Sequence, residues 1–277
     1  MEGAVLEPLV FFEQIDPALV DLFRADEPVW TALDRLGGHL AALFTNAWPL
    51  QGRTGLVERP FAIHEGRVLD RVELVREGPK GGLVARAGGA VLEGAAIVMA
   101  GAYLFDDRVI LGPGTVVEPG ALLKGPTVIG RDSEVRQGAY VRGTCLVGDG
   151  CVIGHTTEVK GSIMLDGAKA GHFAYIGDSI LGRTVNLGAG TKLANLKMVP
   201  GTVTVPVAAE RRDTGRRKLG AVLGDRTEMG CNSVTSPGTL LGPGSLVSPT
   251  VTVPAGFYPS GTVVRAARGS ITIRSSG

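Results

Sequence analysis

Aliphatic residues recur at every sixth position through the middle of this chain, and small residues follow them in phase. The aliphatic positions between 111 and 159 are Leu111, Val117, Leu123, Ile129, Val135, Val141, Val147, Ile153 and Val159. In each of the first eight units the residue four positions later is small, namely Thr115, Ala121, Thr127, Ser133, Ala139, Cys145, Cys151 and Thr157. Weaker copies start at Leu92, Val98 and Leu104, and the count resumes at Leu223, Met229, Thr235, Leu241, Val247 and Val253. A six-residue repeat of this kind predicts a parallel β-helix built from hexapeptides.

Each hexapeptide is expected to form one short strand and one turn, and three of them complete a triangular coil of about 18 residues. The aliphatic residue points into the coil and stacks on its equivalent in the next coil, while the small residue fits the narrow corner. Each inward aliphatic side chain contributes about 1.5–3 kcal/mol, so stability accumulates along the stack. The predicted fold class is therefore mainly β, with the β-helix spanning residues 91–277.

Residues 1–90 lack the clear repeat and are predicted to form a separate N-terminal region. Apolar residues at helical spacing follow Asp16-Pro17 and again follow Glu27-Pro28, so residues 1–47 are expected to be helical. We expect a helical hairpin here that caps one end of the β-helix. Between residues 48 and 90, short apolar runs separated by glycine and proline predict a few strands or irregular coils.

The repeat slips twice between residues 160 and 197, and a histidine lies between the slips. Val159 is followed by Met164 after five residues, and Ile176 is followed by Leu181 after another five. Small bulges are tolerated in a solenoid, but bulges also re-aim side chains near functional sites. Because His172 lies in the slipped coil, this stretch is the candidate site.

Composition narrows the classes of function. The formal net charge of +1 gives no long-range field that would attract nucleic acid or an anionic membrane. No apolar run approaches the roughly 20 residues that a membrane span needs. Three cysteines in 277 residues, and the absence of a signal-peptide pattern, predict a cytoplasmic protein without a disulfide framework.

Two motifs connect the slipped region with a known family. Segment 169–178 reads KAGHFAYIGD, and segment 185–191 reads VNLGAGT. With residues 142–195 around them, they resemble the acetyltransferase domain of the bacterial bifunctional enzyme that acetylates and then uridylylates glucosamine-1-phosphate. Segment 213–225, DTGRRKLGAVLGD, looks more like archaeal sugar-1-phosphate nucleotidyltransferase/acetyltransferases. The resemblance covers residues 92–256 and implies a left-handed β-helix acyltransferase, assembled as a homotrimer with active sites between neighbouring prisms.

The resemblance also implies roles for individual residues. His172 matches the family's general base, and Ala189 matches a backbone contact to acetyl-CoA. Acetyl transfer from a thioester to an amino group needs a neutral amine that loses a proton as it attacks. A histidine side chain of ordinary pKa, about 6.5, can accept that proton at neutral pH, typically for a gain of about 10²–10⁴-fold.

The same comparison implies a set of substrate-binding residues. Tyr175, Asn186 and Asn195 match positions that contact the acceptor sugar phosphate or the acetyl group. Arg142 and Lys160 match the family's phosphate-binding cations. Because they are 18 residues apart, they are expected at the same corner of successive coils, as two cations that bind one phosphate should be.

The chain departs from the family after Asn195. It continues as LKMVP, without a lysine at the family's matching distance, and Lys197 is the candidate substitute. Residues 196–218 form an insertion whose basic cluster is Arg211, Arg212, Arg216, Arg217 and Lys218. That cluster is either a solvated loop or a loop that reaches the phosphate site of a neighbouring subunit. Ninety N-terminal residues are too few for a nucleotidyltransferase domain, which speaks against uridylyl transfer.

A metal site is not expected. His155 and His172 are 17 residues apart, nearly one coil, but the other two histidines lie outside the repeat. A three-histidine zinc site would therefore lack its third ligand. Cys145 and Cys151 occupy the small inward position and are interpreted as core residues.

The sequence thus predicts an acetyl-CoA-dependent N-acetyltransferase that acts on an amino-sugar phosphate or a nucleotide amino sugar by direct attack of the amine. Two alternatives stay open. The first is transfer of a longer acyl chain, as in the β-helix acyltransferases of lipid A synthesis, which differ in groove depth. The second is a non-catalytic trimeric scaffold that binds sugar nucleotides.

Overall fold

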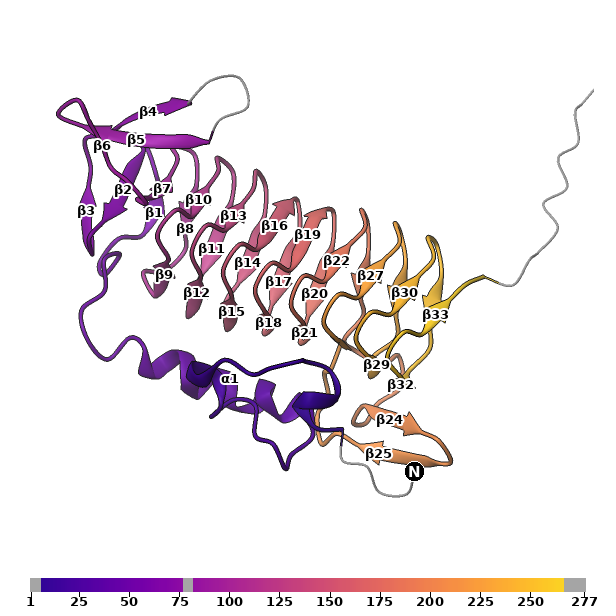
Figure 1. Cartoon of the computed structure of the whole chain (residues 1–277). Helices are drawn as coiled ribbons and strands as arrows, with labels where there is room; N and C mark the ends of the chain where they lie inside the picture. The colour runs from indigo at the N-terminus through magenta and orange to yellow at the C-terminus, as the bar shows by residue number, and fades with distance from the viewer. Residues whose placement is uncertain (1–5, 77–81, 267–277) are drawn as a thin grey trace, which may run out of the picture.

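The computed structural model describes residues 6–76 and 82–266, so residues 267–277 of the predicted β-helix domain lie outside the described residues. The chain forms a left-handed parallel β-helix with three faces, as predicted (Figure 1). Within the described residues, the faces are sheet A with nine strands, sheet B with eleven and sheet C with eight. The chain visits sheets B, A and C in turn, as β16 (Val152–His155), β17 (Glu158–Lys160) and β18 (Ile163–Met164) do.

The strands are short, mostly two to four residues, because a turn interrupts the chain at every corner of the triangle. Sheet A also contains β1 (Gly55–Leu56), β8 (Tyr103–Leu104), β11 (Leu122–Lys124), β14 (Tyr140–Arg142), β20 (Tyr175–Gly177), β23 (Lys192–Leu193), β28 (Val234–Thr235) and β31 (Thr252–Val253). Sheet B also contains β3 (Arg67–Leu69), β2 (Phe61–His64), β7 (Ala96–Val98), β10 (Val116–Val117), β13 (Glu134–Val135), β19 (Lys169–His172), β22 (Asn186–Leu187), β27 (Glu228–Met229), β30 (Leu246–Val247) and β33 (Val263–Val264). Sheet C also contains β9 (Val109–Leu111), β12 (Thr127–Ile129), β15 (Cys145–Val147), β21 (Ile180–Leu181), β26 (Ala221–Leu223), β29 (Thr239–Leu241) and β32 (Gly256–Tyr258).

The aliphatic and small positions of the repeat fill the interior of the prism. All nine aliphatic residues from Leu111 to Val159 are buried, and all eight small residues between them are at most 1% exposed. Val117 pairs with Val135, and Val135 pairs with Ile153, so these coils contain eighteen residues each. The predicted inward stacking is therefore confirmed.

Both predicted five-residue steps are present, and both occur at one corner of the prism. Val147 pairs with Met164, and Met164 pairs with Leu181, so two successive coils contain seventeen residues. The missing residue in each coil lies between sheet A and sheet C. We call this edge of the prism the A–C corner, and the edge between sheet B and sheet A the B–A corner.

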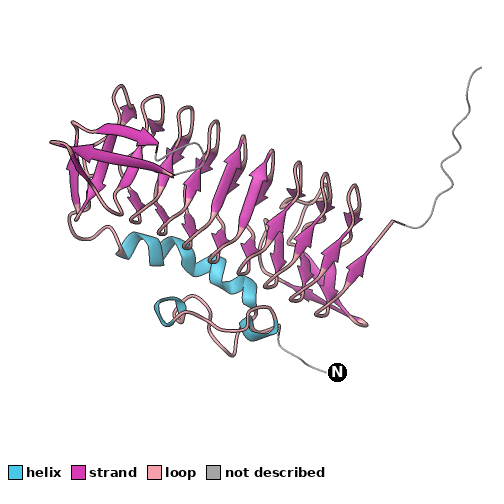
Figure 2. Cartoon of the chain, turned by 45° about the horizontal axis from the view of Figure 1, so that its top comes forward, coloured by secondary structure: helices cyan, strands magenta, loops and turns pink. Residues whose placement is uncertain are grey.

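The outer surface of sheet C is apolar and is covered by the N-terminal segment. Its outward residues include Leu146, Ile163, Ile180, Val222 and Leu240, none more than 9% exposed. They form one hydrophobic cluster with buried residues of the N-terminal segment, including Phe12, Leu22, Leu36 and Leu40. The helix α1 (Ala32–Ala42) runs along this side of the β-helix (Figures 1 and 2). Sheet C is therefore buried on both of its surfaces.

The predicted helical hairpin is wrong. Within the described residues, α1 is the one α-helix, and Pro8–Val10, Pro17–Leu19 and Val29–Thr31 are short 3₁₀ turns. Pro28 disfavours helical geometry at the residue before it, and a segment of ten residues between two prolines is too short to form a stable helix alone. The segment covers a side of the β-helix, and not an end as expected.

The N-terminal end of the β-helix is covered by strands. β1 pairs antiparallel with β8, and β2 pairs antiparallel with β7. A separate antiparallel sheet of β4 (Glu73–Arg76), β5 (Leu83–Ala87) and β6 (Ala90–Val91) lies beside them (Figure 1). The expected few strands between residues 48 and 90 are therefore present.

The insertion after Asn195 contains a β-hairpin. It consists of β24 (Thr204–Val207) and β25 (Glu210–Asp213), which pair antiparallel. Val203 and Val205 are buried in the cluster that joins the N-terminal segment to sheet C. No helix in the described parts of the chain is long and apolar enough to cross a lipid bilayer.

Candidate active site

Two of the predicted cations stack at the A–C corner. Lys124 pairs with Arg142 across β11 and β14, and the register of β14 with β17 places Arg142 beside Lys160 in the next coil. The Arg142 guanidinium donates to Glu158 Oε1 over 2.7 Å, and this hydrogen bond raises the pKa of Arg142 above its ordinary value. Lys160 Nζ lies 2.8 Å from Asp178 Oδ2 and 3.1 Å from Asp178 Oδ1. The predicted stacking of Arg142 and Lys160 is present, and each cation has a carboxylate partner.

Asp178 connects Lys160 with two other predicted residues. The Asn195 amide donates to Asp178 Oδ2, and the Tyr175 hydroxyl donates to Asn195 Oδ1 over 3.3 Å. A side chain at Gly177 would obstruct this arrangement, because a Cβ there would lie 2.6 Å from both the Tyr175 hydroxyl and the Asn195 amide nitrogen. Asp178, Asn195 and Tyr175 are buried or half-buried. The corner thus holds a continuous polar network from Lys160 to Tyr175.

Sequence reasoning missed Asp178, although a signal was available. Asp178 follows Gly177 within the KAGHFAYIGD segment and lies inside the second five-residue step. Asp178 is only 8% exposed, and a buried charge requires a partner of opposite charge. Lys160, one coil earlier, supplies it.

His172 lies on the opposite side of sheet A from this network, at the B–A corner, where the strands of sheet A begin. It ends β19, is exposed, and pairs in register with His155 of the preceding coil. The His172 carbonyl accepts from Gly190 N over 3.0 Å, so the turn that contains Ala189 lies directly against His172. The Phe173 ring contacts His155 with centroids 5.2 Å apart, and Phe173 has a φ of 54°, an uncommon conformation for a bulky residue.

The predicted residues therefore fall into two groups. Arg142, Lys160, Tyr175 and Asn195 meet at the A–C corner, and His172 and Ala189 meet at the B–A corner. Tyr175 begins the strand that joins the two corners, three residues after His172, which is at most about 10 Å of chain.

Asn186 does not join the network at the A–C corner. It lies on β22 in sheet B, beside Lys169, and its amide donates to Glu228 Oε2 over 2.9 Å. Lys197, the candidate substitute for the family's lysine, donates to the carbonyl of Thr202 within the insertion over 2.5 Å.

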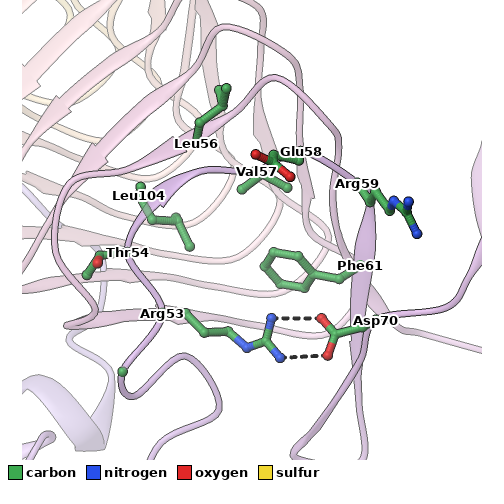
Figure 3. A pocket seen from close by; sticks show the side chains of 11 residues that line it. Arg53, Thr54, Leu56, Val57, Glu58, Arg59, Phe61, Asp70 and Leu104 are labelled. Atoms are coloured by element: carbon green, nitrogen blue, oxygen red, sulfur yellow. Dashed lines mark hydrogen bonds and ion pairs between the residues drawn. The ribbon is translucent and has the colours of Figure 1, made fainter.

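A pocket of about 230 Å³ opens at the A–C corner. Its lining consists of Leu33, Arg142, Gly143, Thr144, Lys160, Gly161, Asp178 and Arg216. A larger hollow of about 440 Å³ lies at the N-terminal end of the β-helix, where the two terminal guanidinium nitrogens of Arg53 each donate to Asp70 over 2.7 Å (Figure 3). None of the predicted site residues lines that hollow. We therefore centre the candidate site on the A–C corner, where four of the predicted residues meet.

Two cysteines of the repeat are core residues, as predicted. Cys145 and Cys151 are buried, and burial raises the pKa of each thiol to about 12, so neither is a thiolate at neutral pH. Among the residues that the structure describes, no three His, Cys, Asp or Glu side chains gather to hold a metal ion.

The repeat is similar in sequence to known proteins. A family model described as the GMPPB C-terminal domain matches residues 123–253. A bifunctional sugar-1-phosphate nucleotidylyltransferase/acetyltransferase of Sulfurisphaera tokodaii is 41% identical over 102 residues, 35% of this chain and 25% of that protein. An uncharacterized acetyltransferase of Escherichia coli, YaiX, is 36% identical over 155 residues, 56% of this chain and 67% of that protein.

Solved structures of similar fold are more distant in sequence. A UDP-N-acetylglucosamine acyltransferase from Campylobacter jejuni is 17% identical, with a TM-score of 0.38 over 60% of this chain and 71% of that chain. Among the curated relatives, this chain spans only about a quarter of the length of the bifunctional enzymes.

Proposed function

We propose an activity for this chain from one premise: the chain belongs to the hexapeptide-repeat acyltransferase family. We infer that it transfers an acetyl group from acetyl-CoA to the amine of an amino-sugar phosphate or a nucleotide amino sugar. The observation that carries this proposal is the network of Lys160, Asp178, Asn195 and Tyr175 at the A–C corner, beside Arg142.

The cations at this corner retain donors for a phosphate. An ammonium group has three N–H donors and a guanidinium has five. Lys160 has two contacts, both to Asp178, and Arg142 uses one nitrogen for Glu158. In our proposal, both residues bind the acceptor phosphate, and the carboxylates hold the two side chains in place before it arrives.

The acceptor would lie along the outer surface of sheet A. Its phosphate would be at the A–C corner, Tyr175 and Asn195 would orient the sugar, and the amine would point toward His172 at the B–A corner. Asn186 and Ala189 lie in the coil that follows His172, and in our proposal they would contact acetyl-CoA. The polar network rigidifies the sugar-binding part, because each of its side chains is fixed by its neighbour.

The proposed reaction is direct transfer. The amine nitrogen attacks the thioester carbonyl, the new C–N bond forms, and the C–S bond breaks. The imidazole of His172 accepts the proton that the amine loses and returns it to the departing thiolate of CoA. No covalent intermediate on the chain is needed.

We also propose that the active assembly is a homotrimer. The N-terminal segment covers sheet C, which leaves the outer surfaces of sheets A and B for neighbouring copies. A neighbour packed against sheet A would exclude water from the acceptor. Light scattering on the purified chain tests this point, and a monomer at micromolar concentration would contradict it.

The activity is tested by measuring CoA thiol release with acetyl-CoA and a panel of amino-sugar 1-phosphates and UDP-amino sugars. The expected result is turnover with at least one acceptor and a loss of about 10²–10⁴-fold in kcat for His172→Ala. His155→Ala is the matched control, because His155 occupies the same corner one coil earlier and is expected to keep kcat within threefold. Full activity in His172→Ala would overturn the proposed role of this residue.

A further inference from the structure

The pocket at the A–C corner is completed by two segments outside the repeat. Leu33 comes from α1, and Arg216 comes from the insertion after Asn195. The Arg216 side chain is only 17% exposed, whereas the neighbouring Arg217 and Lys218 are exposed. One member of the basic cluster is thus directed into this pocket.

The backbone on both sides of Arg216 is fixed. Its N–H donates to the Thr214 hydroxyl over 3.2 Å, and its carbonyl accepts from Val203 N over 2.7 Å. Its Nε donates to the carbonyl of Lys218 over 3.2 Å. A second guanidinium nitrogen is ion-paired with Asp34 of α1. Arg216 is therefore held over the pocket from two sides.

Each cation that lines the pocket is paired with a carboxylate, but two of those three carboxylates lie outside the lining. Arg142, Lys160 and Arg216 line it with one carboxylate, Asp178. Glu158 and Asp34, the partners of Arg142 and Arg216, are not among the lining residues. An anion in the pocket would thus meet three cations from two separate parts of the chain, and charge-assisted hydrogen bonds to a phosphate are stronger than neutral ones.

The geometry points to Arg216 as the third cation of an anion site at this corner, where it binds the phosphate of the acceptor, while Asp34 positions it. Nε and one terminal nitrogen of the guanidinium anchor the side chain on Lys218 and Asp34, and the other terminal nitrogen is left to donate to a phosphate oxygen, an arrangement that a flexible lysine cannot reproduce. The insertion therefore serves the phosphate site of its own subunit. The N-terminal segment acquires a role beyond covering sheet C, because it carries the residue that orients Arg216.

The identity of the acceptor rests on the proposed function, but the binding of a phosphate group does not. The experiment is therefore calorimetric titration of the intact chain with inorganic phosphate, glucosamine 1-phosphate and glucosamine. We expect Arg216→Ala to weaken binding of both phosphorylated ligands by at least tenfold, and to leave glucosamine unchanged. Arg217→Ala, the adjacent arginine, is the matched control and should bind all three ligands as the parent chain does.

Three further variants separate positioning from charge. Arg216→Lys keeps the charge but loses the planar guanidinium that is anchored on Lys218 and Asp34, so it should recover only part of the affinity. Asp34→Asn should weaken phosphate binding by about two- to fivefold, because a carboxylate that is itself 53% exposed fixes its partner only modestly. Asp34→Asn combined with Arg216→Ala should be no weaker than Arg216→Ala alone, since Asp34 acts through Arg216.

The outcomes distinguish this inference from the activity. Unchanged phosphate affinity in a folded Arg216→Ala variant, with a thermal midpoint equal to that of the parent, would overturn the inference even if acetyl transfer proceeds. If the Arg216→Ala variant is unfolded, Arg216→Gln is measured instead. Absence of thiol release with every acceptor, together with phosphate binding that depends on Arg216, would instead overturn the proposed activity and leave the anion site standing.

Discussion

Thr235 occupies an inward position that aliphatic residues fill in the neighbouring coils. It pairs with Leu193 on one side and Val253 on the other, and it is fully buried. Its hydroxyl finds no hydrogen-bond partner among the described residues. An unpaired buried hydroxyl costs roughly 1–3 kcal/mol, so this residue weakens the stack at the coil that follows the insertion.

Thr235→Val should therefore stabilise the chain. Valine has the same shape, and its methyl group replaces the unpaired hydroxyl without a new cavity. We expect the free energy of unfolding to rise by about 1 kcal/mol, or Tm by about 2–4 °C, measured by thermal denaturation. The control is Thr227→Val, because the buried Thr227 hydroxyl donates to the Gly224 carbonyl over 2.8 Å. The control should lose stability, and equal effects in both variants would contradict the argument.

At the scale of single residues, the sequence predicted most of the A–C corner but not its internal partners. Arg142 and Lys160 could be placed together from their spacing, since residues one coil apart share a corner. Asp178 also stands 18 residues after Lys160, so the same count could have paired them, but the carboxylate was overlooked beside the cations. Arg216 could not be placed at all, since nothing in the repeat determines how the insertion folds back.

At the scale of elements, close approach of successive coils limits the residues at the corners. Gly154 in β16 and Gly171 in β19 occupy equivalent positions before His155 and His172. A Cβ on Gly154 would overlap the carbonyl of Gly171, whereas a Cβ on Gly171 would have no atom within 4 Å. Neither glycine has a positive φ, so the two positions differ in available space and not in backbone conformation.

Gly154→Ala should therefore destabilise the chain, and Gly171→Ala should not. The first variant forces β16 and β19 apart at the backbone, which typically costs about 1–3 kcal/mol or more. The second is expected to stay within about 0.5 kcal/mol of the parent chain. Urea denaturation followed by circular dichroism measures both. A Gly171→Ala variant as unstable as Gly154→Ala would show that the coils do not stack in this register.

The elements of the repeat were predictable, because stacking of the coils imposes a fixed period on the sequence. The N-terminal elements have no such period and were not predictable. The two five-residue steps could be counted directly from the aliphatic positions. The α-helix at Ala32–Ala42 forms despite Gly37 and Gly38 in its middle, because its apolar face packs into the cluster on sheet C. Tertiary packing outweighs intrinsic propensity here, and the same packing holds residues 17–31 in short turns.

At the scale of the whole molecule, the chain joins a solenoid to a side layer. A solenoid without such a layer is stabilised by contacts between adjacent coils. The cluster on sheet C differs, because the N-terminal segment touches outward residues of several coils at once. A signal for this layer was present in the sequence: in every third hexapeptide the residue before the inward aliphatic is also apolar, as Leu146, Ile180 and Val222 are. A strand that is apolar on both sides predicts a sheet buried on both surfaces.

The side layer should therefore couple the coils into one cooperative unit. Leu36 of α1 is fully buried in this cluster, and Leu36→Ala is expected to cost about 2–5 kcal/mol. The loss should appear as a single unfolding transition at lower urea, because the cluster spans strands from β15 to β29 and its weakening affects all of those coils. Leu43→Ala is the control: Leu43 directly follows the same helix, is 44% exposed, and the variant should stay within about 0.5 kcal/mol of the parent chain. If Leu36→Ala instead produced an early transition for the helix alone, followed by β-helix unfolding at the parent midpoint, the N-terminal segment would be a dispensable cover.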